Sequence, residues 1–267
     1  MRPLVSRPQA GPCEEVYVEP LFESEGLKLA GHLARPATLG ANAPPGLVLC
    51  HGFPAAPGGA ATSAQTYPNL ANRLAAETGW TVLTFNFRGA GRSEGNFSLA
   101  GWLADLKAAV ARLLEEGVSG IWLAGSSTGG ALSICAAAAD RRVRGVAALA
   151  APATFDMWAA HPRRFLDEAR SIGVVSNRAF PADVEAWSSE LADIRALDVV
   201  DKVPPRPLLL MHGTDDDVVP VQDARTLATA AGNQVDLRLI HGAGHRLRHD
   251  PRAVAFLLGW MERQATA

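Results

Sequence analysis

A serine between two glycines is the first feature of this sequence that suggests chemistry. Gly125, Ser127 and Gly129 form a G-x-S-x-G pattern, which is typical of a nucleophilic serine on a sharp turn from a strand into a helix. Side chains at the two flanking positions would collide with the strand and the helix, so small residues are required there. The neighbouring Ser126 lacks these glycines, which favours Ser127. Taken alone, the pattern also fits an ordinary glycine-rich turn.

Two later loops carry the groups that would activate such a serine. A serine hydroxyl is a weak nucleophile at neutral pH, so it needs an imidazole to accept its proton and a carboxylate to orient that imidazole. Three consecutive carboxylates, Asp215, Asp216 and Asp217, follow one apolar run, and His245 follows the next. Active sites of open α/β sheets lie where strands end. The order along the chain is Ser, Asp, His. The spacing does not decide which of the three aspartates orients the imidazole.

Strands and helices in alternation are expected to hold these residues. Continuous apolar runs predict buried strands at 46–51, 80–87, 120–124, 143–150, 206–211 and 235–240. Apolar residues at helical spacing cover 67–77, 97–116, 131–139, 222–231 and 251–263, with Ser98 as an N-cap. Apolar and polar residues alternate roughly along 16–24 and 27–35, which predicts an antiparallel hairpin. Helical crossovers imply a mainly parallel central sheet with helices on both faces, an α/β fold.

One region interrupts this alternation. Residues 152–205 show no clear strand but contain several aromatic side chains, which predicts a short helical cap inserted over the sheet. Those aromatic residues could form a local core or line a substrate pocket. We expect residues 1–14 to be a disordered lead-in and 15–267 to form a single domain that includes the cap.

Composition narrows the possible partners. The hydrophobic content of 48%, the charged content of 19% and the net charge of -2 suit a globular protein without the basic footprint of a nucleic-acid binder. No segment has the apolar length of a signal peptide or a membrane span, so we expect a cytoplasmic protein without a membrane partner. Cys13, Cys50 and Cys135 have no metal-type spacing, and the last two are expected to be core residues. A monomer or small homo-oligomer is expected.

In the order of its triad residues the chain resembles the α/β-hydrolase superfamily, from the hairpin to the last helix. The resemblance implies an α/β-hydrolase fold in which the acid lies in H-G-x-x-D-x-x-V-P, and this pattern selects Asp216. The family's G-x-G-H pattern places His245 as the base. The oxyanion hole is expected to use the backbone N–H of Thr128, which follows the nucleophile. The resemblance places a second N–H donor on Phe53, in the His51-Gly-Phe-Pro loop.

The same resemblance suggests the reaction. The loop that begins at His51 and the modest cap are similar to those of bacterial carboxylesterases, including feruloyl and cinnamoyl esterases, and to the catalytic domain of prolyl-oligopeptidase-type peptidases. A serine hydrolase that cleaves a small or medium carboxylic ester through an acyl-enzyme is therefore expected, with a small-molecule ester as its partner. Acyl transfer, metal-free perhydrolysis and peptide cleavage are alternatives on the same triad. A non-catalytic receptor or scaffold is disfavoured because such relatives usually lose a triad residue.

No cofactor and no metal are expected. Residues 88–95 read R-G-A-G-R-S-E-G and resemble a structural turn of the family, and they also approach a dinucleotide fingerprint. Glu94 occupies the position where that fingerprint needs glycine or alanine. His241, His245 and His249 do not form a regular helical face, because glycines lie between the first two, so a zinc site is not indicated. His51 is expected to hold its loop by hydrogen bonding, and His32, His161 and His212 to be ordinary core or surface residues.

Overall fold

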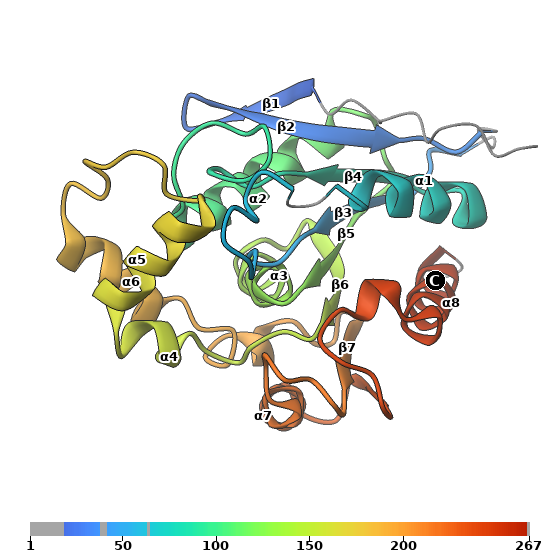
Figure 1. The fold of residues 1–267 in the computed structure, drawn as a ribbon. Coiled ribbons are helices and arrows are strands. Elements are labelled where there is room, and N and C mark those ends of the chain that lie inside the picture. The colour runs from blue at the N-terminus through green and yellow to red at the C-terminus, as the bar shows by residue number, and fades with distance from the viewer. Residues whose placement is uncertain (1–18, 38–41, 63–64, 266–267) are drawn as a thin grey trace, which may run out of the picture.

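A single twisted sheet organises the molecule. The computed structural model describes residues 19–37, 42–62 and 65–265, so the expected lead-in at 1–14 and Cys13 lie outside the described residues. Within these ranges the sheet has eight strands in the order β1-β2-β4-β3-β5-β6-β7-β8 (Figure 1). The strands are β1 Glu19–Ser24, β2 Leu27–Ala34, β3 Gly46–Cys50, β4 Thr81–Phe85, β5 Ile121–Ser126, β6 Val143–Leu149, β7 Leu208–Gly213 and β8 Asp236–Ile240.

The first two strands run antiparallel to each other, and β2 is also antiparallel to β4. All remaining neighbours are parallel. Parallel neighbours need crossover connections, and helices supply them. The longer helices that cover the sheet are α1 Tyr67–Thr78, α2 Leu99–Leu114, α3 Thr128–Ala139, α7 Val221–Ala231 and α8 Pro251–Ala265. The expected α/β fold with a mainly parallel sheet and helices on both faces is confirmed.

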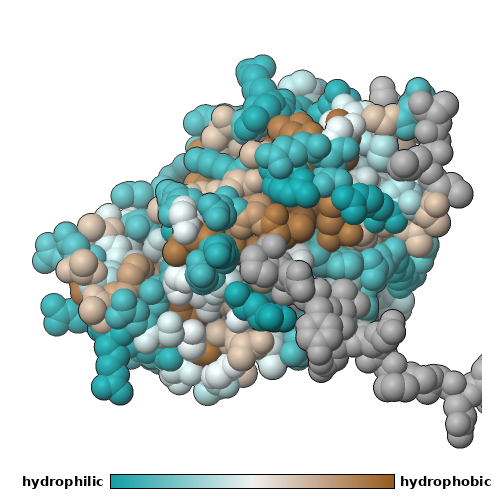
Figure 2. All heavy atoms as spheres, turned by 90° about the horizontal axis from the view of Figure 1, so that it is seen from above, coloured by the Kyte–Doolittle hydropathy of each residue, from teal (hydrophilic) through white to brown (hydrophobic). Residues whose placement is uncertain are grey.

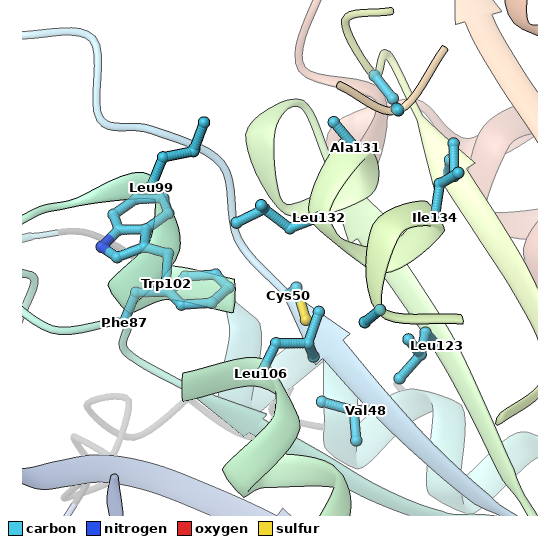
Figure 3. Close-up of a cluster of buried hydrophobic side chains, with 14 of the residues drawn as sticks. Val48, Cys50, Phe87, Leu99, Trp102, Leu106, Leu123, Ala131, Leu132 and Ile134 are labelled. Carbon is cyan, nitrogen blue, oxygen red and sulfur yellow. The ribbon is translucent and has the colours of Figure 1, made fainter. Parts of the chain in front are cut away.

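Successive side chains of a strand point to opposite faces of the sheet, so the core forms two layers. Val48 and Cys50 of β3 belong to the layer beneath α2, α3 and α7, whereas Leu47 and Leu49 belong to the layer beneath α1 and α8. Figure 3 shows Trp102 and other apolar side chains of α2 and α3 gathered around Cys50. Burial raises the pKa of the Cys50 thiol to about 12, so this cysteine behaves as a small apolar core residue.

Helix α2 begins where the sequence predicts its cap. The Ser98 side chain accepts a hydrogen bond of 3.0 Å from the Gly101 amide. This contact satisfies one of the amides that the first turn of a helix leaves without a partner.

Three helices lie between β6 and β7, within the segment 152–205 that we call the cap. They are α4 Asp156–Ala159, α5 Pro162–Ile172 and α6 Val184–Asp193, followed by a short 3-10 turn at Val200–Lys202. Figure 1 shows them to one side of the sheet, next to α2. Viewed from the β1 and β2 side, the surface carries mostly hydrophilic side chains around a band of hydrophobic atoms (Figure 2). In the described ranges, no helix combines the length and apolar character that a bilayer crossing requires.

Candidate active site

Ser127 lies on a strained turn between β5 and α3. Its backbone has φ 52° and ψ -124°, a conformation that is unfavourable for a residue with a side chain. The surroundings leave no room for side chains beside it. A Cβ at Gly125 would collide with the Gly129 carbonyl oxygen, and one at Gly129 would collide with the His51 carbonyl oxygen. The glycines of the G-x-S-x-G pattern are therefore required by close backbone packing.

A carboxylate and an imidazole meet beyond the ends of β7 and β8. His245 Nδ1 lies 2.9 Å from Asp216 Oδ2 and 3.1 Å from Oδ1, so Nδ1 donates to the carboxylate. The other ring nitrogen, Nε2, is then left to accept a proton. Asp215 and Asp217 are exposed, and Asp215 accepts a hydrogen bond of 2.8 Å from the Thr214 hydroxyl. Of the three consecutive carboxylates, the geometry favours Asp216 as the partner of His245.

The Asp216 carboxylate is fully buried and held by several donors. The backbone amides of Val218 and Val219 each donate to Oδ1 at 2.9 Å. Burial alone would raise the pKa of this carboxyl group, but hydrogen bonds from His212 and His245 and from these two amides outweigh burial and hold the pKa well below its usual range. Asp216 therefore stays ionised at any pH near neutrality.

His212 is a third contact of this carboxylate, and it is more than the ordinary core residue expected from the sequence. Its Nε2 lies 2.9 Å from the Val219 carbonyl oxygen and 3.1 Å from Asp216 Oδ2. Both neighbours are acceptors, so Nε2 carries a proton and donates to them. Nδ1 of the same ring is buried without a hydrogen-bond partner in the described part of the chain. His212 and His245 thus both donate to Oδ2 of this carboxylate.

The loop after β3 is anchored by His51. The His51 side chain is buried, its Nδ1 lies 2.7 Å from the Gly52 carbonyl oxygen, and its Nε2 accepts a hydrogen bond of 3.1 Å from the Phe87 amide. Burial, together with the nearby Arg248 charge, lowers the pKa of His51 to about 4 although its bond to Gly52 acts in the opposite direction. The ring is therefore neutral at pH 7 and holds the loop through these contacts.

Two backbone amides near Ser127 remain available to a ligand. The Ser127 amide donates to the Leu149 carbonyl oxygen at 2.8 Å and is occupied. For the amides of Thr128 and Phe53, the described residues provide no hydrogen-bond acceptor. Thr128 is the first residue of α3, where the helix dipole adds a partial positive charge.

The serine, the imidazole and the loop after β3 face one cleft of 260 Å³. Its walls include Ser127, His245 and Phe53, together with Tyr67 at the start of α1 and residues of the loop from His51 to Thr62. Sequence patterns did not identify Tyr67 or the cleft residue Arg248, because both stand outside the motifs that carry the triad. Proximity in the folded chain is the only signal that reveals them.

The cap contributes none of the residues that line this cleft. Its aromatic rings pack on one another and on Phe53: Trp158 and Phe165 are stacked at 4.2 Å, and the Phe53 ring lies 5.1 Å and 5.3 Å from them. Phe97 lies 5.0 Å from Phe53 on the same side. The cap aromatic residues therefore form a local core, the first of the two alternatives that the sequence left open.

The glycine-rich turn at 88–95 is structural. Arg88 Nη2 lies 2.7 Å from Asp105 Oδ1, Nη1 lies 2.9 Å from Glu25 Oε2, and the Arg88 amide also donates to Asp105. The Asp105 side chain is fully buried. The turn thus ties the β1–β2 hairpin to α2 through this arginine.

Comparison with known proteins agrees with the fold. Residues 47–255 match the family model described as "Alpha/beta hydrolase family". The uncharacterized protein YfhR of Escherichia coli O157:H7 is 29% identical over 176 residues, which are 63% of this chain and 54% of that protein. The chain thus matches about half the length of that curated relative.

Solved structures share the architecture at low sequence identity. The alpha/beta hydrolase GrgF from Penicillium sp. sh18 is 22% identical, with 91% of this chain and 96% of that chain covered and a TM-score of 0.67. The Pyrococcus furiosus esterase Pf2001 is 19% identical, with coverages of 91% and 89% and a TM-score of 0.63. These likenesses support the fold, and the family model covers most of the sequence from β3 to α8. The chain belongs to the alpha/beta hydrolase family.

Proposed function

We propose that this protein is a serine hydrolase that cleaves a small or medium carboxylic ester through an acyl-enzyme, with Ser127, Asp216 and His245 as its catalytic triad. The observation that carries the proposal is the His245–Asp216 hydrogen bond of 2.9 Å at a cleft that Ser127 also lines. In support, the hydrogen bond leaves Nε2 of the imidazole available to accept a proton, and Ser127 stands on a strained turn that lines the same cleft.

In the acylation step, Ser127 Oγ forms a bond to the ester carbonyl carbon while His245 Nε2 takes the hydroxyl proton. The carbonyl oxygen becomes negatively charged and accepts hydrogen bonds from the Phe53 and Thr128 amides. The ionised Asp216 stabilises the imidazolium that forms. His245 then gives its proton to the leaving alcohol as the carbon–oxygen bond breaks.

In the deacylation step, His245 removes a proton from water, and the resulting hydroxide attacks the acyl carbon. The tetrahedral intermediate collapses, and Ser127 leaves with the proton returned by His245. The free enzyme and a carboxylic acid are the products, so atoms and charges balance over the cycle.

The size of the substrate follows from the cleft. Its volume of 260 Å³ lies just below the range of about 300–1,000 Å³ that is usual for drug-sized ligands, which favours a short acyl or aryl ester over a long lipid. Pf2001 is known as an esterase, and this supports ester chemistry on the same fold. We expect water to be the acceptor rather than a second alcohol or peroxide.

Active-site labelling tests the proposal. A fluorophosphonate probe should label the wild-type protein and not Ser127→Ala, whereas Ser126→Ala provides a matched control with the neighbouring hydroxyl removed. A panel of p-nitrophenyl esters of increasing chain length should show turnover that declines for long chains. Product analysis with added alcohol or peroxide should show mainly hydrolysis. A folded wild-type protein that is not labelled, or labelling that persists in Ser127→Ala, would contradict the proposal.

A further inference from the structure

Two arginines line the cleft beside the nucleophile. Arg246 follows His245 directly, and Arg248 comes two residues after Arg246; both line the cleft that holds Ser127 and His245. No aspartate or glutamate is among the described residues that line it. The walls therefore place two positive charges, and no carboxylate to balance them, next to the serine.

Arg248 is held in place without an ion pair. Its Nε donates to the Thr66 hydroxyl at 3.3 Å, and its guanidinium carbon lies 5.5 Å from the centre of the Tyr67 ring. Tyr67 is buried, and its ring face orients the guanidinium through a cation–π contact. Across the described ranges, neither Arg246 nor Arg248 lies within ion-pair distance of a carboxylate.

The contrast with Arg88 shows what is missing at this site. Arg88 is largely buried and reaches both Asp105 and Glu25 at 2.7 Å and 2.9 Å. Arg248 is half-buried, and a guanidinium removed from water favours an anionic partner. After burial, the charges of Arg248 and Arg246 further lower the pKa of the adjacent His249, in line with an uncompensated positive field here.

We propose that the cleft accepts esters that carry a carboxylate, with Arg248 as the residue that binds this carboxylate and Arg246 as a second positive charge at the mouth. This inference rests on the proposed esterase function. The planar fork of a guanidinium matches two carboxylate oxygens, and the Tyr67 ring already orients it. The carboxylate can belong to the acyl part or to the alcohol part of the substrate, and the experiment separates these two cases.

Two pairs of esters of similar size provide the test. In the first pair, para-acetoxybenzoate is compared with its methyl ester, so that the charge lies on the leaving alcohol. In the second, p-nitrophenyl hydrogen adipate is compared with its methyl ester, so that the charge lies on the acyl part. For at least one pair, kcat/KM should be about tenfold higher for the anionic ester, the factor expected for one charge-assisted hydrogen bond. Added salt at about 0.5 M should reduce this preference through screening.

Variants assign the preference to the arginine. Arg248→Gln should bring the ratio of the two kcat/KM values close to one, and Arg248→Lys should restore part of it because the charge returns without the fork. Arg225→Gln removes an exposed arginine of α7 that does not line the cleft, and it should leave the ratio unchanged. The ratio is measured within each variant, so a general loss of activity does not affect it.

The outcomes separate this inference from the proposed function. Ser127-dependent hydrolysis of the neutral esters, with no preference for either anionic ester in the wild type, would overturn the inference and leave the esterase function intact. An anionic preference that persists in Arg248→Gln would also overturn it. If Ser127 is not labelled by a fluorophosphonate and no ester is hydrolysed, both proposals fail together.

Discussion

Acidification should weaken the fold through His51, and the structure sets the size of the effect. The pKa of this buried ring is about 4, whereas the unperturbed value is 6.5. The unfolded chain therefore binds a proton as pH falls below about 6.5, and the folded protein does not bind it until about pH 4. In this window the unfolded state holds more protons, so the free energy of unfolding decreases as pH falls.

The difference of about 2.5 pH units, at about 1.36 kcal/mol for each unit, corresponds to about 3 kcal/mol lost from the free energy of unfolding between neutral pH and pH 4. Below pH 4 the contribution of His51 is constant, because both states are then protonated. A loss of this size is a large share of the stability of an ordinary domain.

Urea unfolding at several pH values provides the measurement, with His51→Gln as the comparison. Glutamine offers a donor and an acceptor but does not titrate, so carboxylates that titrate in the same range contribute equally to both proteins. The wild type should lose about 3 kcal/mol more than His51→Gln between about pH 7 and pH 4. Equal pH dependence in the two proteins would refute the assignment of a neutral, buried His51.

Two further predictions concern the acid and the buried arginine. Asp216→Asn should lower kcat by about 10⁴-fold, because an amide can hold the imidazole in the wrong tautomer, while Asp215→Asn should lower it by less than about tenfold. Steady-state kinetics on a p-nitrophenyl ester measures both, and similar losses would contradict the choice of acid. Asp105→Ala leaves the Arg88 guanidinium without its buried partner, and should lower the free energy of unfolding by about 3–5 kcal/mol in urea unfolding. A loss below about 1 kcal/mol would show that water replaces the carboxylate.

Much of the fold could be predicted because the local signals agree with one another. Each continuous apolar run became a strand. Most of these strands are buried on both faces, as β3 shows with Leu47 and Val48 on opposite sides of the sheet, whereas the edge strand β8 is only partly buried. The boundaries differ by one or two residues: the run from 206 begins its strand at Leu208, and Gly213 ends it. Hydrophobic pattern determines which segments are strands, and hydrogen bonding between neighbours determines where each strand ends.

The candidate site was only partly predictable, since contacts between distant residues have no local signature. Three consecutive aspartates look alike in the sequence, and burial beside His245 distinguishes Asp216 from its neighbours. His212 gave no sign that its ring would contact the same carboxylate. The role of the cap aromatic residues also depended on packing, because an aromatic side chain serves a local core as well as a pocket wall.

The position of Phe53 has a consequence for how this enzyme could diversify. Its ring packs against aromatic rings of the cap, and the same residue lines the cleft. Replacements in α4 or α5 that shift this ring would move the proposed oxyanion donor without altering any side chain that contacts the substrate. Changes in the cap would thus adjust the speed of turnover, whereas a change of preferred ester would require replacements in the loops at 51–62 and 245–248. If the proposed function holds, replacements in the cap that leave the cleft wall unchanged should then alter the rate more than the preference among esters.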